Sequence, residues 1–216
     1  SLDEFTHAFN LVNVESLFEV SLLLLNNNVK RILVEKPGAI NIGQLEELNK
    51  KALNGSQQFS IAYNRRFYKS VSSLIEEVKK DGGITNLHFE FTEWVHTIDR
   101  DMYFKEVLSK WIISNSSHVM DTVFYLIGLP TKMQSFITGQ NMIEWHKAGS
   151  VFVGSGLSKR GIPFSYNCNW NSAGRWSIEV TTKKRRFYLA PMEMLRVQNK
   201  GDIEIKNFDI NNNENN

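Results

Sequence analysis

Lys36 is the first residue whose type and position suit chemistry. It lies in the string Val34-Glu35-Lys36-Pro37, directly after a predicted buried strand at residues 31–35. Ligands of open α/β sheets bind outside the carboxyl ends of the strands, where a lysine can transfer a proton or bind a hydroxyl or carbonyl oxygen. Pro37 fixes its own φ angle and would hold Lys36 in a set direction. A solvated lysine in a turn is the alternative.

A second candidate group lies on a predicted helix at residues 115–127. His118, Asp121 and Tyr125 are spaced i, i+3 and i+7, so they share one face of that helix. A neutral histidine beside a carboxylate suits proton transfer near pH 7. A purely structural His–Asp pair is the alternative.

The string Tyr63-Asn64-Arg65-Arg66-Phe67 follows another predicted strand at residues 59–63. It should therefore lie at the same sheet edge as Lys36. Tyr63 could donate a hydrogen bond or stack on a ligand, and the two arginines could bind a phosphate or carboxylate as planar forks. Alternatively, the arginines cap the following helix and pair with surface acids.

Strand and helix patterns alternate over the first 83 residues, which predicts a parallel sheet with right-handed crossovers. After Gly83, closely spaced strand patterns predict an antiparallel or mixed sheet. We therefore expect an α/β domain at 1–83, an α+β domain at 84–206 and a disordered tail at 207–216. The predicted strands of the second domain are 87–91, 133–138, 150–153, 164–170, 176–182 and 187–190.

Composition excludes several classes of protein. The 216 residues include 25 Lys plus Arg and 23 Asp plus Glu, a net charge of +2, which argues against a dedicated nucleic-acid binder. The single cysteine, Cys168, excludes a disulfide framework and a cysteine-based zinc site, and we expect no metal site. It alternates with Phe164, Tyr166 and Trp170, so we expect it to be packed. No apolar run reaches the ~18 residues of a membrane helix and no signal-peptide pattern is visible, which favours a cytoplasmic protein.

Three strings taken together, VEKPGA, YNRRF and HVMDTVFYLIGLP, resemble the Gfo/Idh/MocA oxidoreductase family over roughly residues 8–190. The resemblance implies a partial Rossmann-like parallel segment followed by a C-terminal α+β domain with a large, open, mainly antiparallel sheet. It also implies NAD or NADP as cofactor. The reaction would be hydride transfer at a hydroxyl or carbonyl carbon of a sugar or sugar nucleotide.

The same resemblance gives roles to individual residues. Lys36 and His118 become the catalytic pair, with Lys36 near the nicotinamide and the reacting hydroxyl. Cofactor contacts fall to Glu35, Lys36 and Pro37. Substrate contacts fall to Asp121, Tyr63, Asn64, Arg65 and Asn115.

Two departures from the family pattern affect this interpretation. Many members have an aspartate four residues before the helix histidine, where this chain has Ser114. The glycine-rich G-x-G-x-x-G loop, which holds the cofactor pyrophosphate on backbone N–H groups, is also absent. Gly154, Gly156 and Gly161 have the wrong spacing and indicate a bulge or hairpin turn.

We therefore expect the chain to be a piece of a longer enzyme, inactive and weak in cofactor binding by itself. The main alternative is a non-catalytic sugar-binding or oligomerisation module that has lost the cofactor half. An acid/base enzyme without redox chemistry, such as an epimerase or a lyase, is a weaker alternative.

Aromatic residues give two further expectations. Phe, Tyr and Trp alternate on antiparallel strands and need a partner where no helix covers them. The parallel segment can supply one face only, so we expect a homodimer or homotetramer through the other, open sheet face. Aromatic faces also stack on sugars, so four residues could line a sugar site, with ordinary sheet residues as the alternative: Trp94, His96, Trp170 and Arg175.

Overall fold

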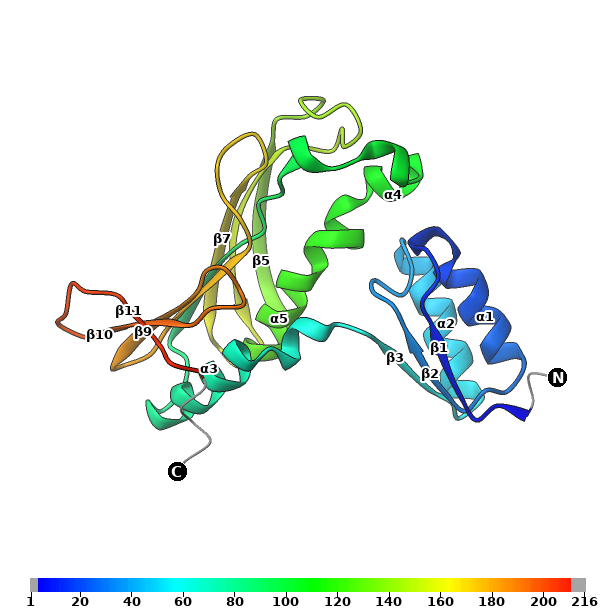
Figure 1. Cartoon of the computed structure of the whole chain (residues 1–216), viewed down its shortest axis with the longest axis horizontal. Coiled ribbons are helices and arrows are strands. Elements are labelled where there is room, and N and C mark those ends of the chain that lie inside the picture. Colours follow the sequence, from blue (N-terminus) through cyan, green and yellow to red (C-terminus); the bar gives the residue numbers. More distant parts are fainter. Residues whose placement is uncertain (1–3, 211–216) are drawn as a thin grey trace. The chain divides into compact units, whose positions relative to one another are not determined.

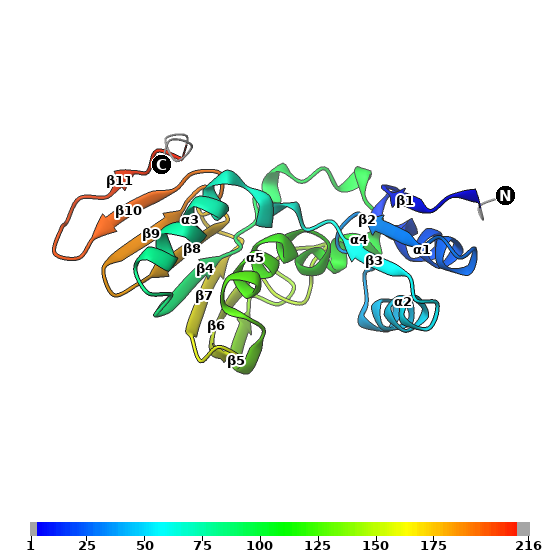
Figure 2. The same cartoon turned by 90° about the horizontal axis from the view of Figure 1, so that it is seen from below.

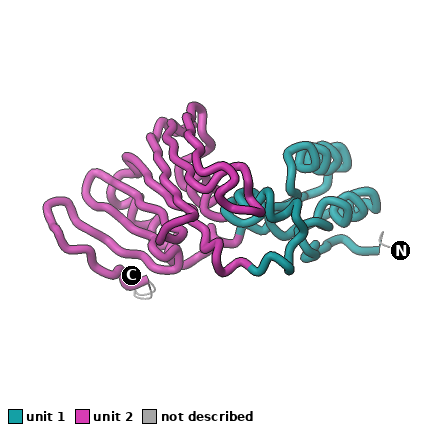
Figure 3. The backbone as a smooth tube through the Cα atoms, turned by 90° about the horizontal axis from the view of Figure 1, so that it is seen from above, with its two compact units in different colours: residues 1–63, 99–117 teal, residues 64–98, 118–216 magenta. Residues whose placement is uncertain are grey.

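The computed structural model describes residues 4–210, which form two compact units (Figure 3). Unit 1 comprises the described residues up to Tyr63 together with Asp99–Ser117, and unit 2 comprises Asn64–Ile98 and the described residues from His118 onward. These contact-based units group the chain differently from the predicted domains 1–83 and 84–206. Of the expected tail, residues 211–216 lie outside the described part and Asn207 lies in a short strand.

Unit 1 contains a three-stranded parallel sheet with the order β1-β2-β3. Helices α1 and α2 lie side by side on one face of it (Figure 1), and Leu25, Ile32 and Leu48 form the core between sheet and helices. Its helices and strands are β1 (His7–Asn10), α1 (Leu17–Asn26), β2 (Arg31–Val34), α2 (Ile42–Asn54), β3 (Gln58–Ile61), α4 (Lys105–Ser109) and the π-helical turn η6 (Ile112–Ser116).

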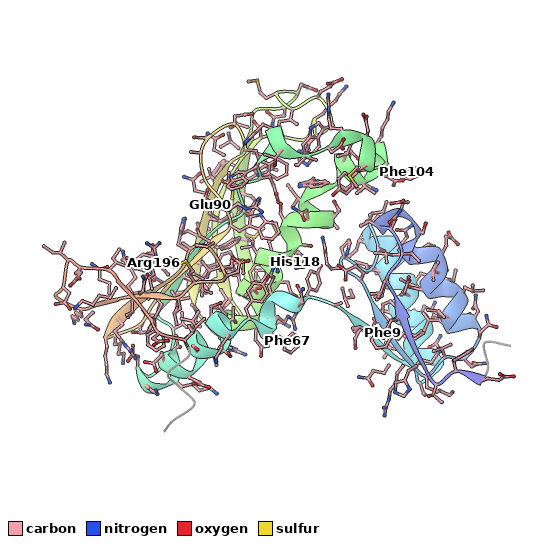
Figure 4. All side chains as sticks on the ribbon, viewed as in Figure 1. Phe9, Phe67, Glu90, Phe104, His118 and Arg196 are labelled. Carbon is pink, nitrogen blue, oxygen red and sulfur yellow. The ribbon has the colours of Figure 1, made fainter. Side chains whose placement is uncertain are left out.

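Local sequence explains where these elements begin and end. The Asn41 side chain accepts a hydrogen bond from the Gln44 N–H at 2.9 Å and caps α2. Asn28, after α1, has a φ of 57°, which asparagine tolerates better than most residues. Strand alternation turns Ala8 toward the helices and Phe9 to the other face, where Phe9 is 71% exposed (Figure 4).

Unit 2 is built on an eight-stranded mixed sheet with the order β11-β10-β9-β8-β4-β7-β6-β5. The pairing of β4 with β7 is parallel and the other pairings are antiparallel, which confirms the mainly antiparallel sheet predicted after Gly83. Its helices and strands are α3 (Lys69–Lys80), β4 (Asn86–Glu90), α5 (Ser117–Ile127), β5 (Pro130–Thr138), β6 (Val151–Ser158), β7 (Pro163–Asn169), β8 (Ser177–Thr181), β9 (Arg185–Leu189), β10 (Arg196–Asn199) and β11 (Lys206–Asn207).

Helices α3 and α5 cover one face of this sheet (Figure 2), and the strand aromatics lie on that face. Phe124 of α5 contacts Phe89 and Phe164 edge-on, at centroid distances of 6.4 and 5.5 Å. The expectation that these aromatics need an oligomeric partner was therefore wrong in its reason, because the helices already cover them. The homo-oligomer itself stays a prediction.

The opposite face of the large sheet is mainly polar. His88 and Ser165 form a hydrogen bond of 2.9 Å across β4 and β7, and Arg186 lies 3.3 Å from Glu179 across β8 and β9. Phe136, on β5, is an exception at 69% exposed. Charged and hydroxyl side chains keep such a face in water without a covering layer.

Cys168 is packed, as predicted. It is 1% exposed, and its Sγ accepts a hydrogen bond from the Phe91 N–H at 3.1 Å. Burial raises the pKa of the Cys168 thiol to about 12, so the reactive thiolate is scarce at neutral pH. No helix in the described part of the chain is long and apolar enough to cross a membrane.

A buried charge network joins α3 to the β8–β9 hairpin. Arg185 donates to both carboxylate oxygens of Asp81 at 2.9 Å and to Glu77 Oε2 at 2.6 Å. Burial alone would raise the pKa of each carboxyl, but the bonds from Arg185, with Lys80 at Glu77 and Thr182 at Asp81, outweigh burial and hold both pKa values below the ordinary range. Both carboxylates therefore stay ionised and stabilise the folded state through Arg185.

Replacing Arg185 with Gln should destabilise the protein by about 3 kcal/mol at pH 7, because two buried carboxylates lose their main partner. Since the carboxyl pKa values are lowered on folding, the network stabilises above the ordinary pKa values of 4.5 and 3.8, and that stabilisation disappears as the pH falls through the lower folded values. Urea unfolding at pH 7 and at pH 3 measures both effects.

The matched control is Arg186→Gln on the same strand, which breaks a pair with two largely solvated partners, 48% and 32% exposed. Its cost should stay within about 0.5 kcal/mol. An Arg185→Gln protein as stable as this control, or equally destabilised at both pH values, would contradict the network's role.

Candidate active site

Lys36 follows β2 in unit 1, at the carboxyl end of the parallel sheet. The Lys36–Pro37 peptide bond is cis, and Gly38 follows with a φ of 84°. A Cβ at Gly38 would lie 2.9 Å from the Ile61 side chain, so glycine permits the close approach of this loop to β3. The Lys36 Nζ donates a 2.8 Å hydrogen bond to the main-chain carbonyl of Ser114. Lys36 is therefore held in a defined direction and is not a solvated turn lysine.

Ser114 lies in the π-helical turn η6, which leads directly into α5. Its Oγ donates to the carbonyls of Val107 and Lys110, both at 3.2 Å, so the side chain is committed to α4 and the residue after it. The main-chain oxygen, not the side chain, thus meets Lys36. A carbonyl can orient the Lys36 amine, but it cannot take a proton at neutral pH. Short π-helical turns occur frequently at functional sites.

The other predicted residues of unit 1 surround the same sheet edge. Glu35 and Pro37 flank Lys36, and the Glu35 N–H donates to the Asn10 carbonyl at 2.8 Å. Tyr63 follows β3, and Asn115 lies in η6 beside Ser114; both are half-buried. The carboxyl ends of three parallel strands thus gather Asn10, Lys36 and Tyr63, which is where an open α/β sheet binds its ligands.

These residues suit the reacting end of a dinucleotide better than its phosphates. Asn10 is 1% exposed; its Nδ2 donates to the Leu17 carbonyl and the Ser21 hydroxyl, and its Oδ1 is buried without a hydrogen-bond partner. The strands follow in sequential order, so no reversal of strand order opens a crevice within this sheet. The turn after β1, Leu11–Asn13, has no glycine to bring backbone N–H groups close to a pyrophosphate. The residues present do not form a phosphate site.

Unit 2 places His118 and Asp121 on α5, with His118 labelled in Figure 4. His118 is 6% exposed, and its ring lies 5.8 Å from the Trp176 ring. Asp121 is bound by Arg66, which donates from Nε to Oδ2 at 2.6 Å and from Nη2 to Oδ1. The Arg66 guanidinium also lies 5.0 Å from the Tyr125 ring. Arg66 therefore contacts both Asp121 and Tyr125, two of the three residues that share one face of α5.

Trp176, which was not predicted as a site residue, is the centre of a second cluster in unit 2. The guanidinium carbons of Arg65 and Arg175 lie 6.0 and 5.0 Å from its ring centroid. Arg175 also stacks on Trp94 at 4.8 Å, so two of the four suspected sugar-site residues meet here. Trp170 instead packs against His146, with ring centroids 4.8 Å apart, and His96 lies exposed in a 3-10 turn.

A buried carboxylate orients the Trp176 ring. Glu93 is 2% exposed; its Oε1 accepts a 3.1 Å hydrogen bond from the Trp176 Nε1–H, and its Oε2 lies 3.8 Å from Arg175. The Trp94 Nε1–H donates to the Gly174 carbonyl at 2.7 Å. Two short strings in the sequence could have indicated this cluster: Glu93-Trp94 and Gly174-Arg175-Trp176. Each places a charged residue next to a tryptophan.

The described site residues thus fall into two sets. Unit 1 holds Glu35, Lys36, Pro37, Tyr63 and Asn115, and unit 2 holds Asn64, Arg65, His118 and Asp121. Asn64 is exposed in the 3-10 turn Asn64–Phe67. In the sequence, Ser114, to which Lys36 binds, precedes His118 by four residues.

Solved structures share this architecture along nearly the whole chain. UDP-N-acetylglucosamine 3-dehydrogenase GnnA from Acidithiobacillus ferrooxidans matches 96% of the chain with a TM-score of 0.71 and 13% identity. An inositol dehydrogenase homolog from Azotobacter vinelandii, complexed with NADH and myo-inositol, matches 94% with a TM-score of 0.72 and 14% identity. The super-repressor mutant of Gal80p from Saccharomyces cerevisiae matches 97% with a TM-score of 0.76 and 16% identity.

The chain has the Gfo/Idh/MocA fold. This confirms the fold that the sequence resemblance implied, namely a parallel Rossmann-like part followed by a large mixed sheet. The chain spans 64%, 55% and 64% of the lengths of the three solved structures, in the order given above. No protein-family model and no curated protein sequence matches it.

Replacing Gly174 should distort the Trp176 cluster. The φ of Gly174 is 151°, and a Cβ there would overlap the Glu90 carboxylate and lie 3.2 Å from Thr92. Gly174→Ala should therefore lower stability by about 2 kcal/mol and change the tryptophan emission. Urea unfolding followed by fluorescence measures both.

Gly201→Ala is the matched control, because Gly201 also has a positive φ, 93°, but a Cβ there meets nothing within 4 Å. It should show only the smaller cost of the backbone conformation, about 1 kcal/mol. Equal losses for the two variants would show that the close approach at Gly174 is unimportant.

Proposed function

We propose that the chain supplies the Lys36 loop and the substrate-binding sheet of an NAD(P)-dependent oxidoreductase. The reaction is hydride transfer at a hydroxyl or carbonyl carbon of a sugar or sugar nucleotide. The observation that supports this most strongly is the hydrogen bond from Lys36 to the Ser114 carbonyl, four residues before His118 in the chain. It fixes a proton-transfer group at the strand end where this fold class binds ligands.

The proposed roles of the chain's own residues follow from their chemistry. Lys36 binds the reacting hydroxyl and takes its proton during oxidation, which raises the electron density on the carbon and favours departure of the hydride. Its charged form then stabilises the oxygen as negative charge develops. His118 assists proton transfer or binds a second hydroxyl. The nicotinamide, when bound, accepts or supplies the hydride.

The substrate class rests on chemistry and on likeness together. GnnA is described as a UDP-N-acetylglucosamine dehydrogenase, and the inositol dehydrogenase homolog was solved with myo-inositol, so both neighbours act on or bind a polyhydroxy ring. Trp94 and Trp176 add aromatic surface that suits sugar C–H groups, and the arginines beside them offer donors for hydroxyl or anionic oxygens. A homodimer or homotetramer through the large sheet is part of this proposal.

A second candidate function is a non-catalytic, ligand-binding module. One observation favours it: the fold is also that of Gal80p, which was solved as a super-repressor mutant. Ser114 stands where many members of the resembled family have an aspartate, so one possible acid/base carboxylate is missing. Its hydroxyl donates to the carbonyl of Val107 in α4 and to that of Lys110. The retained Lys36, His118 and Asp121 favour the oxidoreductase.

Replacing Lys36 with Ala should lower kcat by about 100-fold or more, with a smaller change in KM, because the proton acceptor is lost while most substrate contacts remain. The measurement is steady-state NAD(P)H formation by the native protein, with UDP-N-acetylglucosamine and myo-inositol as the substrates. Lys50→Ala, on an exposed position of α2, is the control and should leave turnover unchanged.

Turnover by Lys36→Ala within a few-fold of the unaltered protein would contradict the assignment of Lys36. If either sugar binds but neither gives a change in NAD(P)H with the unaltered protein, the non-catalytic module is favoured instead.

A further inference from the structure

Three arginines of unit 2 lie in the clusters around His118 and Trp176, and their partners differ. Arg66 is used by the Asp121 carboxylate in a two-fold hydrogen bond. Arg175 lies 3.8 Å from Glu93, a distance at which the charges attract but the hydrogen bond is poor. The Arg65 guanidinium lies against two aromatic rings and forms no ion pair within the described residues 4–210. Two adjacent arginines of the same 3-10 turn, Arg65 and Arg66, therefore have separate functions.

Arg65 presents a charge that no protein carboxylate neutralises within residues 4–210. Its guanidinium carbon lies 4.7 Å from the Tyr68 ring centroid and 6.0 Å from that of Trp176. Stacking uses the flat faces of a guanidinium and leaves the N–H groups around its edge able to donate in the plane. A carboxylate or phosphate is the group whose geometry fits two such parallel donors.

Arg175 provides a second guanidinium at the same indole. Its carbon lies 5.0 Å from the Trp176 ring centroid, and its side chain is 44% exposed. Glu93 Oε2 lies 3.8 Å from Arg175, and the other oxygen of that carboxylate already accepts the Trp176 Nε1–H.

We infer that the substrate has an oxyanion, a carboxylate or a phosphate, which Arg65 binds with the help of Arg175 beside Trp176. This inference rests on the proposed function, because it names the substrate class of the same site. A neutral polyol would leave the Arg65 charge without a partner when it displaces water, which weakens binding. An anionic sugar neutralises that charge, so the site selects sugar acids, sugar phosphates or sugar nucleotides over neutral sugars.

The experiment is isothermal titration of the chain with three probes: glucuronate, UDP-N-acetylglucosamine and myo-inositol. The two anionic probes separate a carboxylate source from a phosphate source, and the neutral probe reports sugar binding without an anion. At least one anionic probe should bind about tenfold or more tighter than myo-inositol. Titration needs no hydride transfer, so it separates this inference from the catalytic proposal.

Variants assign the selectivity to named residues. Arg65→Gln should abolish most of the preference for the anionic probe, and Arg65→Lys should restore part of it, because lysine keeps the charge but not the planar fork. Arg175→Gln should reduce the preference less, because Glu93 already attracts that arginine. Arg186→Gln, at the opposite end of the β8–β9 hairpin from Trp176, is the control and should bind like the unaltered chain. Circular dichroism confirms that each variant is folded.

The outcomes are distinct. An anion preference that Arg65→Gln removes and Arg186→Gln keeps supports the inference. Equal binding of neutral and anionic probes, or an unchanged preference in Arg65→Gln, overturns it and leaves the oxidoreductase proposal in place. Binding of none of the three probes overturns the inference and removes the substrate-site part of the proposed function as well.

Discussion

The hydrogen bond from the Lys36 Nζ to the Ser114 carbonyl joins residues that are 78 positions apart in the chain. It ties the loop after β2 to the π-helical turn that runs into α5. The segment Asp99–Ser117 accordingly belongs with the parallel sheet rather than with the large mixed sheet. A lysine amine keeps one direction only if a fixed acceptor holds it, and a main-chain oxygen does not move with a side-chain rotamer. The proposed chemistry depends on this constraint.

In the unit with the large sheet, buried polar groups orient side chains that are exposed. Glu93 is almost fully buried, yet it satisfies both the Trp176 Nε1–H and, at longer range, Arg175. Trp176 in turn offers its ring to Arg65, Arg175 and His118. A ring held by a buried hydrogen bond is a rigid platform, and the arginines on it lose little conformational freedom when a ligand binds. Removing the carboxylate would free the platform as well as change its charge.

Periodicity predicted the elements well where hydrophobic residues repeat. The stripe of Val119, Val123 and Ile127 is buried, as expected for the inward side of α5, and β1–β3 pair in parallel. The strand aromatics were expected to need an oligomeric partner, because alternation shows which residues share a face but not which face α3 and α5 cover. Candidate site residues were found where they follow a strand or share a helix face, as Lys36 and His118 do.

The remaining features depend on contacts that spacing cannot show. Glu93 and Trp176 are 83 positions apart, so their hydrogen bond has no local pattern. Arg65 and Arg66 are neighbours of one type, and only the directions in which they leave the 3-10 turn decide which one Asp121 binds. The π-helical turn at Ile112–Ser116 has a sequence that an ordinary helix also accepts, so nothing in it predicts that the Ser114 carbonyl meets Lys36.

The central claim is that this site serves hydride transfer, and isotope transfer tests it most directly. The native protein would be incubated with the ketone form of its sugar substrate and with NADH that has deuterium at both positions of nicotinamide C4, and the sugar product would be examined by mass spectrometry and NMR. We predict deuterium bound to the carbon that becomes the alcohol. Product formed with hydrogen from solvent at that carbon, or deuterium that stays entirely in the cofactor, would contradict the account.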